Sequence, residues 1–245
     1  MTSNSIRAVR YQQVRSRQVA VLKVRRGDDD MTEAGVLLKL GRHPRIVRFI
    51  GQCEDKDGRL LVTEFAEYGS LSDALCHELR GQVSLEHQLV MMQQIAQGME
   101  HVADHAVVHR DLAARNVLLF KFDVNDVRKT SVKVTDLGLA TELNNRTHAT
   151  LGEGAQPYRY MPPESIQFRQ FSEKSDVWAY GVTCWEILTC AKIPYYNITQ
   201  DDGVIQFVCS GGRLQRDEIE GECPDTLWEL MEDCWRTNHG DRPKF

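Results

Sequence analysis

The chain has 245 residues, with 30 lysines and arginines against 35 aspartates and glutamates, and a formal net charge of −5. This length allows one large domain or two lobes, and the charge balance argues against general binding to nucleic acid or to a membrane surface. The seven cysteines form no CxxC pair, which argues against a disulfide framework and a zinc site. Their odd number favours a reducing compartment.

The sequence contains no run of about twenty apolar residues, and its N-terminus, MTSNSIRAVR, has no apolar signal region. We therefore expect a soluble, cytoplasmic protein with no membrane span in this chain. The oligomeric state does not follow from the sequence.

Alternating and β-branched runs dominate between Val9 and about Phe65, and they predict a small sheet. The runs are QVAVLKV, IVRFIGQC and RLLVTEF. One helical stretch, MTEAGVLLKLGRH, interrupts them. The apolar stripe of that helix is expected to contain Ala34, Leu37, Leu38 and Leu40.

Helical patterns follow the stretch EYGSLSDAL. The segment SLEHQLVMMQQIAQGMEHVADH predicts a long helix with Ser84 as its N-cap. SEKSDVWAYGVTCWEILTC is apolar nearly all round, as a central buried helix should be, and PDTLWELMEDCW is amphipathic. The apolar face of the long helix is expected to contain Leu85, Leu89, Met92, Ile95 and Met99.

These patterns together predict an α+β fold with two lobes. A small β-rich lobe is expected at about residues 1–65 and a larger helical lobe at about 70–245. The segment EFAEYGS, at 64–70, would form the hinge between them. The cleft between the lobes is the expected ligand site.

The segment VVHRDLAARNVLL, at residues 107–119, combines two apolar runs with a group of polar side chains. The apolar flanks hold both ends of the segment inside the protein, so its polar atoms must be paired or must face a cleft. The polar residues are His109, Arg110, Asp111, Arg115 and Asn116.

The order of motifs resembles the eukaryotic protein kinase family. HRDLAARN is followed, 25 residues after Asp111, by DLG, and then by MPPE, SDVWAYGV and CWRTNHGDRPKF. HRDLAARN, in place of HRDLKPEN, is similar to the tyrosine-kinase and tyrosine-kinase-like branch. The resemblance implies a bilobal kinase fold, ATP and Mg²⁺ as cofactors, and a protein substrate.

The resemblance also implies roles for individual residues on the large lobe. Asp111 would accept the proton of the substrate hydroxyl, and Arg115 would contact the acceptor region. Asn116 and Asp136 would bind the metal through hard oxygen atoms.

On the small lobe, Lys23 would hold the ATP phosphates and pair with Glu33, in the helix that follows. Thr63 matches the residue at the back of the adenine pocket. The remaining residues expected to contact the nucleotide are Glu64 and Ala66, through their backbone, and Leu118.

Other residues match positions that hold the two lobes together. Glu164 and Arg242 would form a buried ion pair, and Asp176 would brace the HRD backbone. The apolar column that couples the lobes would contain Leu37, Phe49, His109 and Leu137.

The sequence departs from the family pattern in its phosphate loop and its activation segment. TSNSIR, without glycine, stands where a GxGxxG loop is expected, which predicts weaker ATP binding or a chain that begins midway through a longer protein. The chain also stops at Phe245, where the family normally has one more helix, so we expect it to be incomplete at both ends. Between Gly138 and Pro157 there is no tyrosine, so a phosphate there would be carried by threonine and would pair with Arg110. The threonines are Thr141, Thr147 and Thr150.

Two questions stay open at this point. QPYRYMPPE is similar to the substrate platform of tyrosine kinases, with Tyr160 in place of the usual Trp and Pro162 in place of the usual Ala. Related enzymes with the same motifs phosphorylate serine or threonine, so the acceptor stays open. The missing glycines also leave a pseudokinase, acting as a nucleotide-binding or scaffolding module, as the alternative to an active enzyme. A small-molecule phosphotransferase is disfavoured by MPPE and Arg242.

Overall fold

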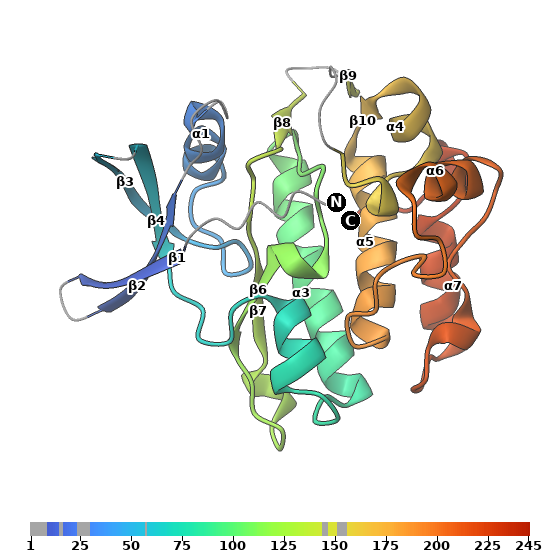
Figure 1. The fold of residues 1–245 in the computed structure, drawn as a ribbon, viewed down its shortest axis with the longest axis horizontal. Helices are drawn as coiled ribbons and strands as arrows, with labels where there is room; N and C mark the ends of the chain where they lie inside the picture. The colour runs from blue at the N-terminus through green and yellow to red at the C-terminus, as the bar shows by residue number, and fades with distance from the viewer. Residues whose placement is uncertain (1–8, 15–16, 24–29, 57, 144–146, 151–155) are drawn as a thin grey trace.

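The computed structural model describes residues 9–14, 17–23, 30–56, 58–143, 147–150 and 156–245. A four-stranded sheet with one helix lies at one end of the molecule, and a larger helical region lies at the other (Figure 1). The predicted α+β, two-lobed fold class is confirmed. The small region contains β1 (Val9–Val14), β2 (Arg17–Lys23), α1 (Asp30–Leu40), β3 (Phe49–Asp55) and β4 (Gly58–Glu64).

The large region begins after residues 65–70 and is mainly helical. Its helices are α2 (Leu71–Asp73), which continues as a π-helical turn over Ala74–Glu78, α3 (Leu85–Asp104), α4 (Pro163–Phe168), α5 (Glu173–Leu188), α6 (Asp201–Cys209) and α7 (Asp225–Cys234). Its short strands are β5 (Val107–Val108), β6 (Val117–Lys121), β7 (Ser131–Val134), β8 (Thr141–Glu142), β9 (Ala149–Thr150) and β10 (Gln170–Phe171). No described helix is long and apolar enough to cross a membrane.

The small sheet is antiparallel, with the strand order β1-β2-β4-β3. Ala20 lies opposite Thr63, and Leu22 lies opposite Leu61. Because side chains alternate between the two faces of a strand, these four residues share one face. Leu61 belongs to the same buried cluster as Leu37 of α1, and Leu22 packs against that cluster. The sheet is thereby joined to α1 and to the main core.

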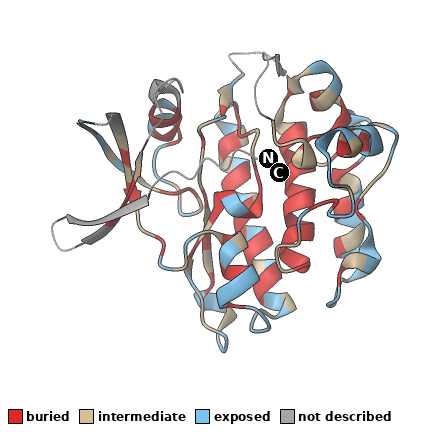
Figure 2. Cartoon of the chain, in the orientation of Figure 1, coloured by how far each residue is buried: buried red, intermediate tan, exposed pale blue. Residues whose placement is uncertain are grey.

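The core of the large region is centred on α3 and α5, whose buried residues dominate the middle of the molecule (Figure 2). Trp178 and Trp185 of α5 are fully buried, as the apolar sequence of this helix predicts. The contact between α5 and α7 is close at Gly181, where a Cβ atom would lie 2.7 Å from Nε1 of Trp235. A glycine is therefore needed at that position.

The helix predictions are confirmed in part. Ser84 caps α3, because its hydroxyl accepts a hydrogen bond from the backbone N–H of His87 at 3.4 Å. Two residues of the predicted stripes face solvent instead: Leu38 is 67% exposed and Leu89 is 39% exposed. The buried face of α1 is centred on Glu33, Val36, Leu37 and Leu40, and Leu38 lies away from it.

Candidate active site

The catalytic candidate Asp111 follows β5 and is held by residues of the short turn at Ala114–Asn116. The amide nitrogen of Asn116 donates to the Asp111 carboxylate at 2.8 Å and to the Asp111 carbonyl oxygen at 2.7 Å. The guanidinium of Arg115 pairs with the other carboxylate oxygen. The structure therefore brings together three of the five polar residues that the sequence singled out on this segment.

The electrostatic surroundings of Asp111 favour a proton acceptor. Burial raises the pKa of Asp111 above its ordinary value, and the charge of Arg115 opposes that shift. The nearby Asp136 carboxylate raises the pKa further. A base is more effective when its pKa lies closer to the working pH.

His109 is fully buried and serves as a structural residue. Its Nε2 donates to the carbonyl oxygen of Thr135 at 3.0 Å, while Nδ1 accepts from the backbone N–H of Asp111 at 3.3 Å. Both ring nitrogens of His109 therefore have partners in the backbone. Asp176 accepts from the backbone N–H groups of His109 at 2.7 Å and Arg110 at 2.9 Å. The predicted bracing role of Asp176 is confirmed.

The candidate metal ligands are the carboxylate of Asp136 and the amide oxygen of Asn116. Both hydrogen bonds of the Asn116 side chain use its nitrogen, so its oxygen is the atom able to bind a cation. Hard oxygen donors of this kind suit Mg²⁺. In the part of the chain that the structure describes, no group of three or more His, Cys, Asp or Glu residues could hold a metal. Two protein oxygen donors fit an ion that takes its other ligands from phosphate and water.

The expected adenine site lies where β4 leads into residues 65–70. Thr63 is buried, and the backbone N–H of Glu64 donates to the carbonyl oxygen of Arg48 at 3.1 Å. In the described chain the backbone N–H of Ala66 has no hydrogen bond, so it is available to a ligand. Leu118 forms a bridge with Ser70 and so lies beside the same segment.

Lys23 and Glu33 come from different elements of the small lobe. Lys23 ends β2 opposite Leu60, and its side chain lies outside the described residues. Glu33, on α1, is 7% exposed. Their pairing and their contact with phosphate stay predictions. The segment TSNSIR also lies outside the described part of the chain.

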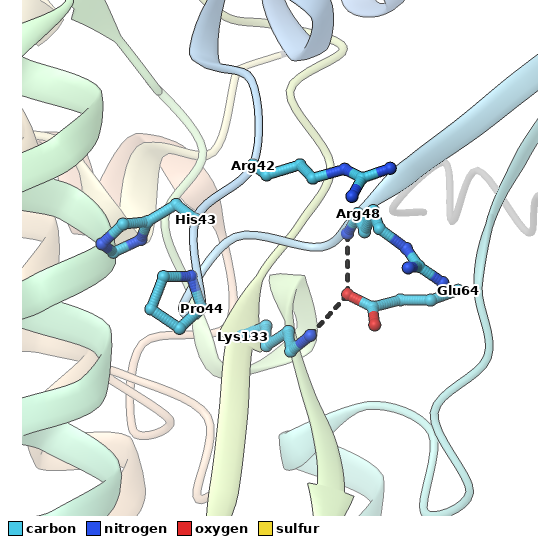
Figure 3. A pocket seen from close by; sticks show the side chains of 6 residues that line it. All are labelled: Arg42, His43, Pro44, Arg48, Glu64 and Lys133. Carbon is cyan, nitrogen blue, oxygen red and sulfur yellow. Dashed lines mark hydrogen bonds and ion pairs between the residues drawn. The ribbon is translucent and has the colours of Figure 1, made fainter.

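The Glu64 side chain lies at a site that the sequence did not indicate. Its carboxylate accepts from Lys133 Nζ at 2.6 Å and from the backbone N–H of Arg48 at 2.8 Å. Figure 3 shows both bonds, and the one from Lys133 joins the hinge to β7 of the large lobe. A cavity of about 290 Å³ opens here, lined also by Arg42, His43 and Pro44. No sequence motif marks this contact, because Lys133 and Glu64 are 69 residues apart.

The candidate substrate platform contains the turn at Tyr158–Tyr160. Glu164 and Arg242 form the predicted ion pair, with two bonds of 2.7 and 3.0 Å, and Arg242 is 3% exposed. The Tyr160 hydroxyl donates to the buried Glu186 at 2.7 Å. Sequence reasoning gave Glu186 no role, although a glutamate within an apolar helix is a usable signal.

The column predicted to couple the lobes is buried at Leu37, His109 and Leu137 and partly buried at Phe49. Leu37 and Leu137 belong to one core cluster, and Phe49 packs against it.

Arg110, the expected partner of a phosphothreonine, donates to the carbonyl oxygen of Leu139 at 2.7 Å. Thr147 is exposed, and its phosphorylation stays a prediction.

The sequence matches known proteins over most of its length. The family model for protein tyrosine and serine/threonine kinases matches residues 6–245. The chain is 37% identical to ephrin type-A receptor 3 of Danio rerio over 93% of this chain and 23% of the receptor. It is 38% identical to ephrin type-A receptor 8 of Rattus norvegicus over 90% of this chain and 56% of that protein. It is 36% identical to the tyrosine-protein kinase transforming protein Abl of Abelson murine leukemia virus, over 89% and 28%.

The chain belongs to the protein tyrosine and serine/threonine kinase family. Within that family, these similarities lie with the tyrosine-kinase branch. The chain spans between about a fifth and just over half of the length of the curated relatives it matches.

Proposed function

We propose that this chain is an active kinase domain that transfers the γ-phosphate of Mg-ATP to a hydroxyl group of a protein, with tyrosine as the preferred acceptor and serine or threonine as the alternative. The observation that carries the proposal is the bonded arrangement of Asp111, Arg115 and Asn116 next to Asp136. Phosphoryl transfer needs positioning and charge neutralisation more than covalent chemistry, and this arrangement supplies both.

The acceptor hydroxyl would lie against the Asp111 carboxylate. Its oxygen forms the new bond to the γ-phosphorus while the bond to the leaving ADP breaks, and its proton passes to Asp111. Asn116 keeps the carboxylate in one orientation through the bond of 2.8 Å. Arg115 lies beside the same carboxylate and would contact the acceptor region. Asn116 and Asp136 would hold Mg²⁺, which would supply charge neutralisation on the phosphates.

The nucleotide would bind between the hinge and Leu118. The open N–H of Ala66 is the backbone donor for the base edge, and Thr63 would close the back of the pocket. Lys23 and Glu33 would hold the phosphates from the small lobe.

The test is a transfer assay with Mg-ATP on a mixture of tyrosine, serine and threonine peptides, run beside Asp111→Asn. We expect transfer by the unmodified chain and a loss of about 10²- to 10⁴-fold in the variant, the usual contribution of a general base. The phosphorylated residue then identifies the acceptor. Asp123→Asn, a similar change in the β6–β7 loop, is the matched control and should keep full activity.

The alternative is a pseudokinase, and the glycine-free segment TSNSIR favours it. The ATP affinity of Lys23→Met distinguishes an active kinase from a pseudokinase. The adjacent change Leu22→Met is the control. In an active kinase the lysine variant weakens ATP binding and the leucine variant does not. Absence of transfer, with ATP affinity unchanged by Lys23→Met, would support the pseudokinase.

We also propose a reducing, cytoplasmic location, which is supported by seven free cysteines.

A further inference from the structure

Glu186, in the middle of α5, connects two segments of the candidate site. Its side chain is 4% exposed, and both carboxylate oxygens accept hydrogen bonds. One oxygen accepts from the backbone N–H of Ala114 at 2.9 Å, and the other accepts from the Tyr160 hydroxyl at 2.7 Å. Ala114 begins the turn that carries Arg115 and Asn116, and Tyr160 ends the turn of the substrate platform. A single buried carboxylate therefore links the catalytic loop to the platform.

Tyr160 makes a second contact that leads to the catalytic carboxylate. The guanidinium of Arg115 lies 4.7 Å from the centre of the Tyr160 ring. A cation over the face of a tyrosine ring is attracted by the ring electrons. Arg115 in turn pairs with Asp111. The contacts form one chain, from Glu186 through Tyr160 and Arg115 to Asp111.

Burial and the neighbouring charges change the pKa of Glu186, so the link that it makes depends on pH. Burial raises the pKa of Glu186 to about 7, and the bonds from Ala114 and Tyr160 and the charge of Arg115 oppose the shift. The Asp111 carboxylate raises the pKa as well. The titratable groups facing Glu186 are thus Tyr160 on the platform and Arg115 and Asp111 on the catalytic loop. A buried acceptor loses stability when one of its donors is removed.

We propose that Glu186 and Tyr160 are positioning residues that couple the substrate platform to the orientation of Arg115 and, through it, of Asp111. This inference rests on the proposed function. A peptide bound on the platform would press on the turn at Tyr158–Tyr160, and the ring of Tyr160 would transmit that contact to Arg115. The phenol is suited to this role because its ring holds the cation while its hydroxyl anchors to α5.

The first test is Tyr160→Phe, which keeps the ring under Arg115 and removes the bond to Glu186. We expect kcat to fall about ten-fold, the usual effect of losing one hydrogen bond to a charged group. The KM for ATP should stay unchanged. Tyr196→Phe, at an exposed tyrosine of the neighbouring loop, is the matched control and should leave kcat unchanged.

The second test is Glu186→Gln, which retains an oxygen for the Ala114 N–H but no negative charge. The fall of kcat that protonation of Glu186 causes near pH 7 should be present in the unmodified chain and lost in this variant, in which the fall caused by protonation of Asp111 is left. Because both residues act through one contact, the double variant should be no slower than the slower single variant. Additive losses, or an unchanged pH profile in Glu186→Gln, would overturn the coupling.

A readout without catalysis separates this inference from the proposed function. The Arg115 Nε–H resonance should shift when Tyr160→Leu removes the ring, and Ala114 amide exchange should accelerate about ten-fold in Glu186→Ala. If the unmodified chain transfers no phosphate but both signals change, the proposed function fails and the structural link stands. If transfer occurs but neither signal changes, the link is wrong. Should Glu186→Ala unfold, the Tyr160→Phe kinetics and the Arg115 resonance still decide the question.

Discussion

The two sides of the cleft are built in different ways. On the large lobe, Asp111, Arg115 and Asn116 lie within six consecutive residues and bond to one another, so local sequence determines their geometry. On the small lobe, the candidate residues are spread over β2, α1 and β4. Their relative positions depend on strand register and on how α1 packs. The acceptor half of the site is therefore a local structure, whereas the nucleotide half is a tertiary one.

On the large lobe, buried carboxylates also accept hydrogen bonds from the backbone of the catalytic loop. Asp176 holds the backbone of His109 and Arg110, and Glu186 holds that of Ala114. Both acids belong to α5, the most buried helix of the described chain. Changes in the large lobe are therefore expected to alter chemistry and stability more strongly than changes at the contact between the lobes.

The largest effect is expected for Asp136→Asn. Replacing the carboxylate with a neutral amide weakens the Mg²⁺ site, and losing several kcal/mol of charge stabilisation corresponds to roughly a thousand-fold in rate. Folding should be nearly intact, as measured by thermal unfolding. Asp126→Asn, in the β6–β7 loop, is the control with the same chemical change. Full activity of Asp136→Asn at saturating magnesium would show that the large-lobe half does not bind the metal.

Glu164→Gln tests the framework of the same half. Arg242 is held by Glu164 and also donates to the carbonyl oxygen of Lys174 at 2.9 Å, so the variant leaves its charge buried with a weaker partner. The free energy of unfolding should fall by roughly 3–5 kcal/mol, measured by urea denaturation. The control is Asp225→Asn, at an exposed pair with Arg216, and it should change little. Equal small effects in both would contradict the framework role.

The contrast between the lobes also explains what the sequence could predict. The short spacing within HRDLAARN was enough to predict the group around Asp111, and the apolar pattern predicted the buried α5. The links from Glu186 to Tyr160 and from Lys133 to Glu64 join residues 26 and 69 positions apart. Such bonds depend on how separate elements pack, and no local pattern contains that information. Leu38 was predicted to lie on the buried stripe of α1 but is exposed. This error has the same origin, because the sequence of a helix with many apolar residues does not reveal which face the sheet covers.

Asp176→Asn tests the brace under the catalytic loop through its pH dependence. Burial raises the pKa of Asp176 from 3.8 to about 6. The Asp176 carboxylate therefore binds a proton more tightly in the folded chain than in the unfolded chain. The stabilisation from the protonated group is present below about pH 4 and is lost as pH rises to about 6. The stability of the unmodified chain relative to Asp176→Asn should therefore fall across this window, by up to roughly 3 kcal/mol, and then level off. Urea denaturation from pH 4.5 to 7.5 measures it, and a difference that rises with pH would refute it.

The smallest effect is expected where the two halves meet, at Lys133→Met. The ion pair between Lys133 and Glu64 is only partly shielded, with both side chains 18% exposed, so its loss should lower the free energy of unfolding by about 1 kcal/mol or less. Its local effect should be larger than its global one, because this pair joins the hinge to β7. Amide exchange in residues 65–69 should accelerate, while exchange in α3 and α5 stays unchanged. Lys129→Met, at an exposed pair with Asp123, is the control and should alter neither region. Faster exchange throughout the large lobe would mean that this contact supports the whole fold, and that the two halves of the cleft are less independent than their construction indicates.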